Sequence, residues 1–193
     1  MKRSDINGLI RAAHTCFQEH GWAMPPKPRW DVTDFGLADI SRHGLILVNL
    51  AEEREYCEKL MWARKGMTTP IHCHRRKKED IICRWGTLGI RMWRGAHDGP
   101  QGLPMPARID GVDGTVHSGE MVELAAGSRV TMGTGIWHTF APLSEACIIG
   151  EVSTANDDVA DNHFADPAVG RFPDIDEDVP ADPSLCWETQ AAR

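Results

Sequence analysis

The chain has 193 residues, of which 25% are charged and 41% hydrophobic, a composition typical of one globular domain with its own core. The formal net charge of -7 argues against a nucleic-acid-binding protein, because a surface that follows a phosphate backbone needs an excess of basic residues. No apolar run approaches the roughly 20 residues of a membrane span. Six scattered cysteines without a CxxC pair indicate free thiols, which favours a cytoplasmic protein.

The N-terminal part of the sequence, residues 1–43, predicts a helix and a wrapping loop. Residues 3–20 carry apolar side chains at helical spacing, and Gly21 stands where such a helix would end. The segment "AMPPKPRWDVTDFG" (23–36) is rich in proline, so we expect a loop that runs over the surface.

From residue 44 to about 155 the sequence reads as a series of short strands. "GLILVNL" (44–50) is a compact apolar run, and "REYCEKLMWAR" (54–64) has a period of two. Further strands are predicted near residues 68–75, 79–85, 87–94, 120–124, 128–132, 137–142 and 146–153. Many short strands with glycine-rich turns indicate a sandwich or a closed barrel.

Two segments are expected to lie outside these strands. "HDGPQGLPMPARIDGVDG" (97–114) is rich in proline and glycine and predicts a long loop. The acidic, proline-rich C-terminal segment, residues 156–193, is expected to close one opening of the barrel. The whole chain is thus predicted to be a single domain.

The segment "IHCHRRKKED" carries the first candidate site. On a strand, His72 and His74 point to the same face and can bind one metal ion. A turn or bulge in "RRKK" (75–78) would return Glu79 to that face. Two imidazoles and one carboxylate suit Mn(II), Fe(II) or Zn(II). The alternative is that the histidines are surface residues and that Glu79 pairs with a lysine.

Two spaced motifs resemble those of the cupin family. The first has the spacing Gly66-(5)-His72-(1)-His74-(4)-Glu79-(6)-Gly86, and the second Gly127-(5)-Gly133-Thr134-Gly135-(2)-His138. Gly133 replaces the usual proline and Pro142 the usual asparagine. The resemblance implies a mainly β fold, a cupin (double-stranded β-helix or jelly-roll) barrel with an N-terminal helical segment, and adds His138 as the fourth metal ligand.

The flanking text is similar to the D-lyxose isomerase family of cupins over roughly residues 45–180. The similarity lies in "EYCEKLMWARKGMTTPIHCHRRKKEDIICRWGTLGI", "GTGIWHTF", "IGEVSTANDDVADNHF" and "RFPDIDED". It implies a Mn(II)-dependent aldose–ketose isomerase that interconverts D-lyxose and D-xylulose, with D-mannose and D-fructose as a further pair, by proton transfer through a metal-stabilised enediol. It also implies a sugar as the partner and a homodimer as the assembly, in which strands such as "LILVNL" would pair.

The resemblance also suggests residues that act on the sugar. Lys77 lies between the ligands of the first motif, and Glu151 lies in the apolar strand "ACIIGEVST". Both are predicted to be catalytic, although a solvated turn or a paired strand end would also explain them. Predicted sugar-binding residues follow in the C-terminal segment, where turn or tail positions are the alternative: Asp161, Arg171, Asp176 and Glu177.

Three other functions remain open at this level. "RRKK" could bind the phosphate of a phosphorylated sugar, although no glycine-rich phosphate cradle accompanies it. The same ligand set also suits an Fe(II)-dependent dioxygenase, although the polar segment "NDDVADN" favours a hydroxylated substrate. The third alternative is a sugar-binding cupin without turnover.

Overall fold

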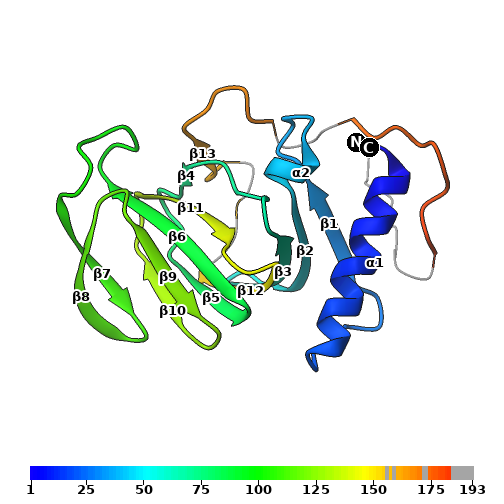
Figure 1. Ribbon diagram of the computed structural model, residues 1–193, viewed down its shortest axis with the longest axis horizontal. Coiled ribbons are helices and arrows are strands. Elements are labelled where there is room, and N and C mark those ends of the chain that lie inside the picture. Colours follow the sequence, from blue (N-terminus) through cyan, green and yellow to red (C-terminus); the bar gives the residue numbers. More distant parts are fainter. Residues whose placement is uncertain (155–156, 158–159, 171–173, 184–193) are drawn as a thin grey trace.

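A computed structural model describes residues 1–154, 157, 160–170 and 174–183 of the chain (Figure 1). The first elements are α1 (Arg3–Glu19), β1 (Arg29–Thr33), α2 (Ile40–His43), β2 (Leu45–Glu52), β3 (Tyr56–Arg64), β4 (His72–Cys73), β5 (Glu79–Trp85) and β6 (Thr87–Arg94). They are followed by β7 (Pro104–Ile109), β8 (Val112–His117), β9 (Met121–Ala125), β10 (Arg129–Met132), β11 (Ile136–Pro142), β12 (Ala146–Thr154) and β13 (His163–Phe164). The described helices include none long and apolar enough to cross a membrane.

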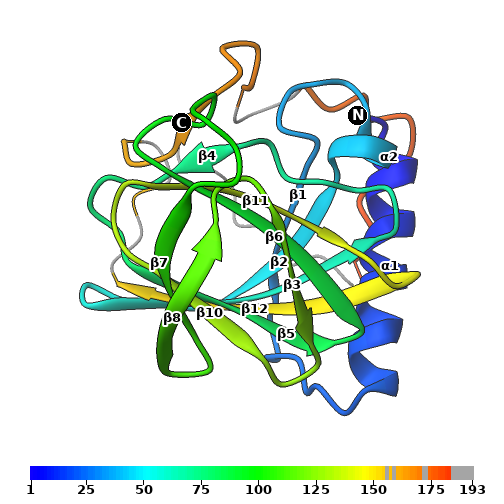
Figure 2. The ribbon, with the colours of Figure 1, turned by 60° about the vertical axis from the view of Figure 1, so that its left-hand side comes forward.

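The strands form two sheets that face each other (Figure 2). The larger sheet has the order β1-β2-β3-β12-β5-β10-β7-β8, and the smaller one the order β13-β4-β11-β6-β9. Neighbouring strands in both of these orders pair antiparallel. Consecutive strands alternate between the sheets from β4 to β6 and from β9 to β12, which is the pattern of a jelly-roll barrel.

The core fills the space between the two sheets. Leu88, Ile90 and Phe140 contribute from the smaller sheet, and Met61 and Ile81 from the larger one, all of them buried. Burial of this apolar surface provides the main favourable free energy of folding. The inward positions toward one end of the barrel are polar instead, and they form the cavity described below.

Helix α1 covers the outer face of the larger sheet, beside β1 and β2 (Figure 1). Phe17 of the helix stacks on Trp30 of β1, with 6.0 Å between the ring centroids. The tail at residues 174–183 lies along the same helix. Arg3 forms an ion pair with Glu177, and Ser4 donates to Asp178 through both its backbone N–H and its hydroxyl.

Several predicted elements agree with the structure and three expectations are wrong. β5 and β6 have the predicted bounds, and α1 ends two residues before Gly21, whose φ is +78°. The proline-rich segment 23–36, however, contains strand β1, and the expected loop 97–114 contains β7 and the start of β8. β2 pairs with both β1 and β3, so its backbone edges are filled and cannot pair with a second chain.

Candidate active site

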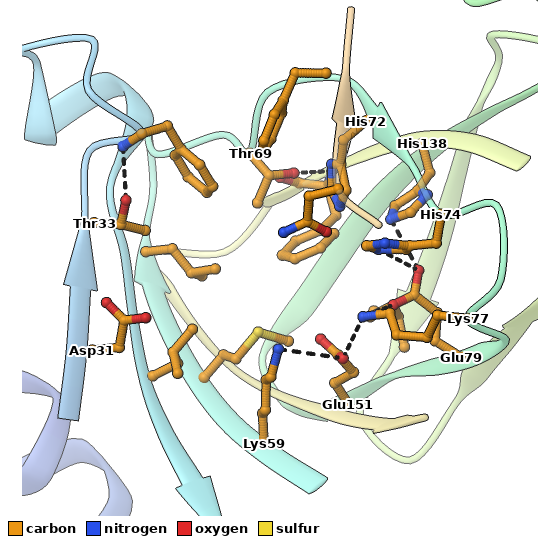
Figure 3. A pocket seen from close by; sticks show the side chains of 18 residues that line it. Asp31, Thr33, Lys59, Thr69, His72, His74, Lys77, Glu79, His138 and Glu151 are labelled. Carbon is orange, nitrogen blue, oxygen red and sulfur yellow. Dashed lines mark hydrogen bonds and ion pairs between the residues drawn. The ribbon is translucent and has the colours of Figure 1, made fainter. Parts of the chain in front are cut away.

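A cavity opens between the two sheets, and both polar and apolar side chains line it (Figure 3). The charged and imidazole side chains that line it are Asp31, Lys59, His72, His74, Lys77, Glu79, His138 and Glu151. Its apolar lining includes Phe35, Leu45, Leu47, Met61, Ile81 and Phe140. Buried charged groups are costly unless they are paired or bind an ion, so this concentration calls for a chemical explanation.

Three imidazoles converge at one end of the cavity. His72 on β4 is directly opposite His138 on β11, with ring centroids 4.1 Å apart. His74 follows β4 at the i+2 position, as predicted for side chains on one face of an extended segment. One ring nitrogen from each histidine lies within 4.8 Å of those of the other two. The three rings can therefore bind a single ion.

Each ring is oriented by a backbone carbonyl. The Nδ1 atoms of His72, His74 and His138 lie 2.8, 2.9 and 3.1 Å from the carbonyl oxygens of Pro70, Asp161 and Ile136. Because a carbonyl only accepts, Nδ1 carries the proton and Nε2 presents its lone pair to the cavity. Histidine ligands in metal sites typically donate their other ring N–H to a carbonyl or carboxylate in this way.

The protonation state of the rings agrees with that role. Burial, with a smaller contribution from His138, lowers the pKa of His72 to about 3. Burial also lowers the pKa values of His74 and His138, so all three rings are neutral at pH 7. Nε2 of His138 is buried and makes no hydrogen bond to any of the described residues. A lone pair left in this way is what a cation requires.

Glu79, the first residue of β5, completes the set. Its Oε1 lies 3.5 Å from Nε2 of His74 and 3.2 Å from Nε2 of His138. Burial acts to raise the pKa of Glu79, but His138 and Lys77 outweigh it and hold that pKa below its usual range. We call His72, His74, Glu79 and His138 the ligand cluster. Three nitrogen lone pairs and a buried carboxylate fit a divalent cation.

The turn that returns Glu79 to the cavity is organised by Asp161. The Asp161 carboxylate accepts hydrogen bonds from the backbone N–H groups of Arg75, Arg76 and Lys77, at 2.9 to 3.1 Å. Its own carbonyl orients His74. The expected turn in "RRKK" is therefore present, and it is held by a residue far away in the sequence.

A chain of alternating charges lies beside the ligand cluster. Nζ of Lys77 is 3.0 Å from Oε2 of Glu79 and 2.8 Å from Oε1 of Glu151. The ammonium group of Lys59, which pairs in register with Glu151 across β3 and β12, lies 3.7 Å from the same Oε1. All four side chains are buried and line the cavity.

These contacts determine the charge of each group. Burial acts to lower the pKa of Lys77, but the carboxylates of Glu151 and Glu79 outweigh it and raise that pKa above its usual range. Burial acts to raise the pKa of Glu151, but Lys59 and Lys77 hold it below its usual range. The cavity therefore contains a protonated amine in direct contact with an ionised carboxylate, a donor and an acceptor for proton transfer.

The sequence is similar to those of known proteins. The family model described as D-lyxose isomerase matches residues 27–188. The chain belongs to the D-lyxose isomerase family. A D-lyxose/D-mannose isomerase of Serratia proteamaculans is 37% identical over 223 aligned positions, which cover 97% of both chains. The D-lyxose/D-mannose isomerase of Escherichia coli O157:H7 is 33% identical over 230 aligned positions, which cover 100% of both. The prediction of a sugar isomerase is confirmed at the level of the family.

Solved structures confirm the predicted fold. An L-ribose isomerase of Cellulomonas parahominis matches with a TM-score of 0.69 and 17% identity, over 91% of this chain and 98% of that one. An L-ribose isomerase of Acinetobacter sp. DL28 matches with a TM-score of 0.65 and 17% identity, over 88% and 94%. At this identity the likeness concerns the fold alone, which is the cupin barrel.

Three of the four residues predicted to bind sugar from the C-terminal segment of this D-lyxose isomerase family member do not line the cavity. The Asp161 carboxylate serves the turn described above and does not line the cavity. Asp176 and Glu177 lie at the N-terminus of α1, where Asp176 forms a bridge with Lys2 and Glu177 pairs with Arg3. Arg171 lies outside the described residues.

The sequence prediction missed five polar residues that line the cavity: Asp31, Thr33, Lys59, Thr69 and Asn162. Lys59 lies on the face of β3 that also carries Met61 and Ala63, and a lysine on an apolar strand face was a usable signal. Asp31 and Thr33 come from β1, in the segment predicted to be a loop, where the neighbouring prolines concealed the period of two.

Proposed function

We propose that the protein interconverts D-lyxose and D-xylulose, and with them D-mannose and D-fructose. The observation that carries this proposal is the contact between Lys77 and Glu151, which provides a proton donor and acceptor beside the ligand cluster in one cavity. The relatives named above are called isomerases of these aldoses, which supports the same substrates here.

We further propose that the ligand cluster binds a divalent cation, Mn(II) in the first instance. A divalent cation at this place supplies electrophilic stabilisation of the negative charge that develops on the sugar oxygens. The neutral imidazoles and the ionised Glu79 support this assignment, because they offer lone pairs without a competing proton.

In the proposed reaction Glu151 is the base. Its carboxylate takes the proton from C2 of the aldose, the C1=C2 bond of the enediol forms, and the O1 oxygen takes a proton from the ammonium of Lys77. The O2–H proton then returns to the amine of Lys77 while the C2=O bond forms. C1 takes the proton held by Glu151. Both side chains end in their starting states, so the atoms and charges balance.

Lys59 has a supporting part in this scheme. Its ammonium group lies 3.7 Å from Glu151 and helps to keep that carboxylate ionised, which a base requires. The apolar walls of the cavity lower the local dielectric constant and strengthen these interactions. Lys59 therefore positions the Glu151 carboxylate and keeps it ionised.

The phosphorylated-sugar alternative loses its structural support. Arg75, Arg76 and Lys78 are exposed, and none of them lines the cavity. The exposed Arg76 forms ion pairs with Asp157 and with the buried carboxylate of Asp161. A phosphate bound there would lie outside the cavity that holds Lys77 and Glu151.

Location and assembly are also proposals. The described cysteines, Cys16, Cys57, Cys73, Cys83 and Cys147, are free thiols, which supports a reducing cytoplasm. A homodimer is proposed from the family resemblance, and light scattering of the purified protein measures it directly.

The decisive test is a metal-restored assay. The protein is stripped with a chelator, reconstituted with Mn(II) and assayed for ketose formation from D-lyxose, D-mannose and control aldoses. We expect turnover that requires the metal and falls by at least about 100-fold in both Lys77→Met and Glu151→Gln.

Lys78→Met is the matched control for this assay, because Lys78 is an exposed neighbour that does not line the cavity. Metal binding without ketose from any free sugar would refute the proposed isomerase. Oxygen uptake with Fe(II) would then favour the dioxygenase. A sugar-binding cupin would be favoured if the wild-type protein shows no turnover and the Lys77→Met and Glu151→Gln variants bind the sugar with the same affinity as wild type.

A further inference from the structure

The two polar regions of the cavity lie on opposite sides of it (Figure 3). The ligand cluster occupies one side, with Lys77 and Glu151 beside it. Across the cavity, β1 contributes Asp31 and Thr33, whose positions on the strand have the same parity and therefore face the same way. Leu45, Leu47 and Met61 line the cavity as well and are apolar.

The two proposed substrates differ only at the end of the sugar that is remote from the carbonyl. D-Lyxose and D-mannose have the same configuration at C2, C3 and C4, so groups near C1 and C2 meet the same surface in both sugars. The hexose differs by one additional carbon and hydroxyl at the end remote from the carbonyl. Residues beside the ligand cluster therefore have little means to distinguish the two sugars, and discrimination has to come from the remote side.

We propose that Asp31 and Thr33 bind the terminal hydroxyl groups of the sugar and set the preference between the pentose and the hexose. This inference rests on the proposed function, because it takes the ligand cluster as the place of C1 and C2. Asp31 is exposed and lines the cavity on the side away from the ligand cluster, which is the side that faces the end of the sugar remote from C1 and C2 in this arrangement.

The two side chains offer complementary hydrogen bonds. The carboxylate of Asp31, which also has a contact within the protein, is an acceptor with about four lone-pair directions, and its side chain lines the cavity. Oγ1 of Thr33 accepts the backbone N–H of Phe35 at 2.8 Å, and its own proton can be donated to a sugar oxygen. β1 is the outermost strand of the larger sheet, so a change there leaves the ligand cluster intact.

The test compares Asp31→Asn and Asp31→Ala with the matched control Arg29→Gln. Arg29 lies on the same strand and at the same parity, but it pairs with Glu52 and does not line the cavity. For each protein, kcat/KM is measured with D-lyxose and D-mannose, and Mn(II) affinity is measured by calorimetry. We expect kcat/KM for D-mannose to fall at least about tenfold in both Asp31 variants, because each variant loses a hydrogen bond between the sugar and a charged group.

Under the same change we expect kcat/KM for D-lyxose to stay within about twofold, and Mn(II) affinity to stay unchanged. Arg29→Gln should leave the ratio of the two sugars as it is. An unchanged ratio in the Asp31 variants, or equal losses for both sugars, would overturn this inference while leaving the isomerase intact. Wild-type protein that converts neither sugar would overturn the proposed function, and the inference with it.

Discussion

The Asp161 carboxylate accepts a 2.9 Å hydrogen bond from the backbone N–H of Lys77, across 84 positions of the sequence. The same carboxylate accepts the N–H groups of Arg75 and Arg76, and the Asp161 carbonyl orients His74. Asp161, which lies between β12 and β13, thus fixes the turn that carries Lys77 and leads into Glu79. Asp161 is a positioning residue of the site, although it does not line the cavity.

Asp161→Asn should therefore weaken metal binding. The amide group of asparagine would place N–H against N–H in the turn, and supporting groups of metal ligands typically contribute a factor of about 10 to 100 in affinity. Titration calorimetry with Mn(II) measures the loss. Asp157→Asn is the control, because Asp157 pairs with the exposed Arg76 side chain. Equal affinity in Asp161→Asn and wild type would refute this role.

Metal binding should stabilise the fold through the ligand cluster. A ligand that binds only the native state, at 100 times its dissociation constant, adds about 2.7 kcal/mol to the free energy of unfolding. For a chain of this size that raises Tm by roughly 5 to 10 °C. Thermal denaturation of chelator-treated protein with and without Mn(II) checks this value.

The stabilisation should disappear in His138→Ala and persist in His117→Ala. His138 contributes a buried Nε2 to the cluster, whereas His117 lies on the exposed hairpin of β7 and β8. A shift of the same size in both variants would place the metal elsewhere.

The two buried lysines should differ in their contribution to stability. Lys77 contacts Glu79 and Glu151, so Lys77→Met leaves two buried carboxylates without their nearest cation and should cost about 3–5 kcal/mol. Lys59→Met should cost less, about 1–3 kcal/mol, because Glu151 keeps Lys77 at 2.8 Å. Urea unfolding of the metal-free proteins gives both values. A larger loss of stability in Lys59→Met than in Lys77→Met would contradict the arrangement of alternating charges.

The sequence predicted the barrel, and it predicted that His72, His74 and Glu79 lie close together, because both depend on local patterns. A period of two or an apolar run marks β2 and β3, and the spacing of His72, His74 and Glu79 is confined to eight residues. The side chains of His74 and Glu79 meet because one turn joins β4 and β5. His138 was placed by the second motif and lies directly opposite His72.

The missed strands have a physical reason. β7 contains Pro104 and Pro106, yet it pairs with β10 only at Arg108 and Ile109, so neither proline lies in that ladder. β1 is an edge strand that begins after the prolines. Contacts between distant segments, such as those of Asp161 with the turn and of Glu177 with Arg3, carry no local signal at all.

Gly86, which ends the first motif, should be more sensitive to substitution than Gly127, which begins the second. Both have a positive φ, +84° and +96°, a conformation that costs alanine about 1–2 kcal/mol. A Cβ at Gly86 would also lie 2.5 Å from the Ala146 carbonyl oxygen and 3.1 Å from Sγ of Cys147, whereas a Cβ at Gly127 would meet no atom of the described chain within 4 Å.

Gly127→Ala should therefore lower the free energy of unfolding only by the cost of its positive φ. Gly86→Ala should lower it by about 1–3 kcal/mol more, because the added Cβ overpacks the site. Chemical denaturation of the two variants and wild type measures the difference. Because the Ala146 oxygen belongs to the backbone of β12, the chain around Gly86 can relieve the overlap only by moving β5 and β6 away from it. Equal losses at the two glycines would show that the motif requires glycine for its backbone angle alone.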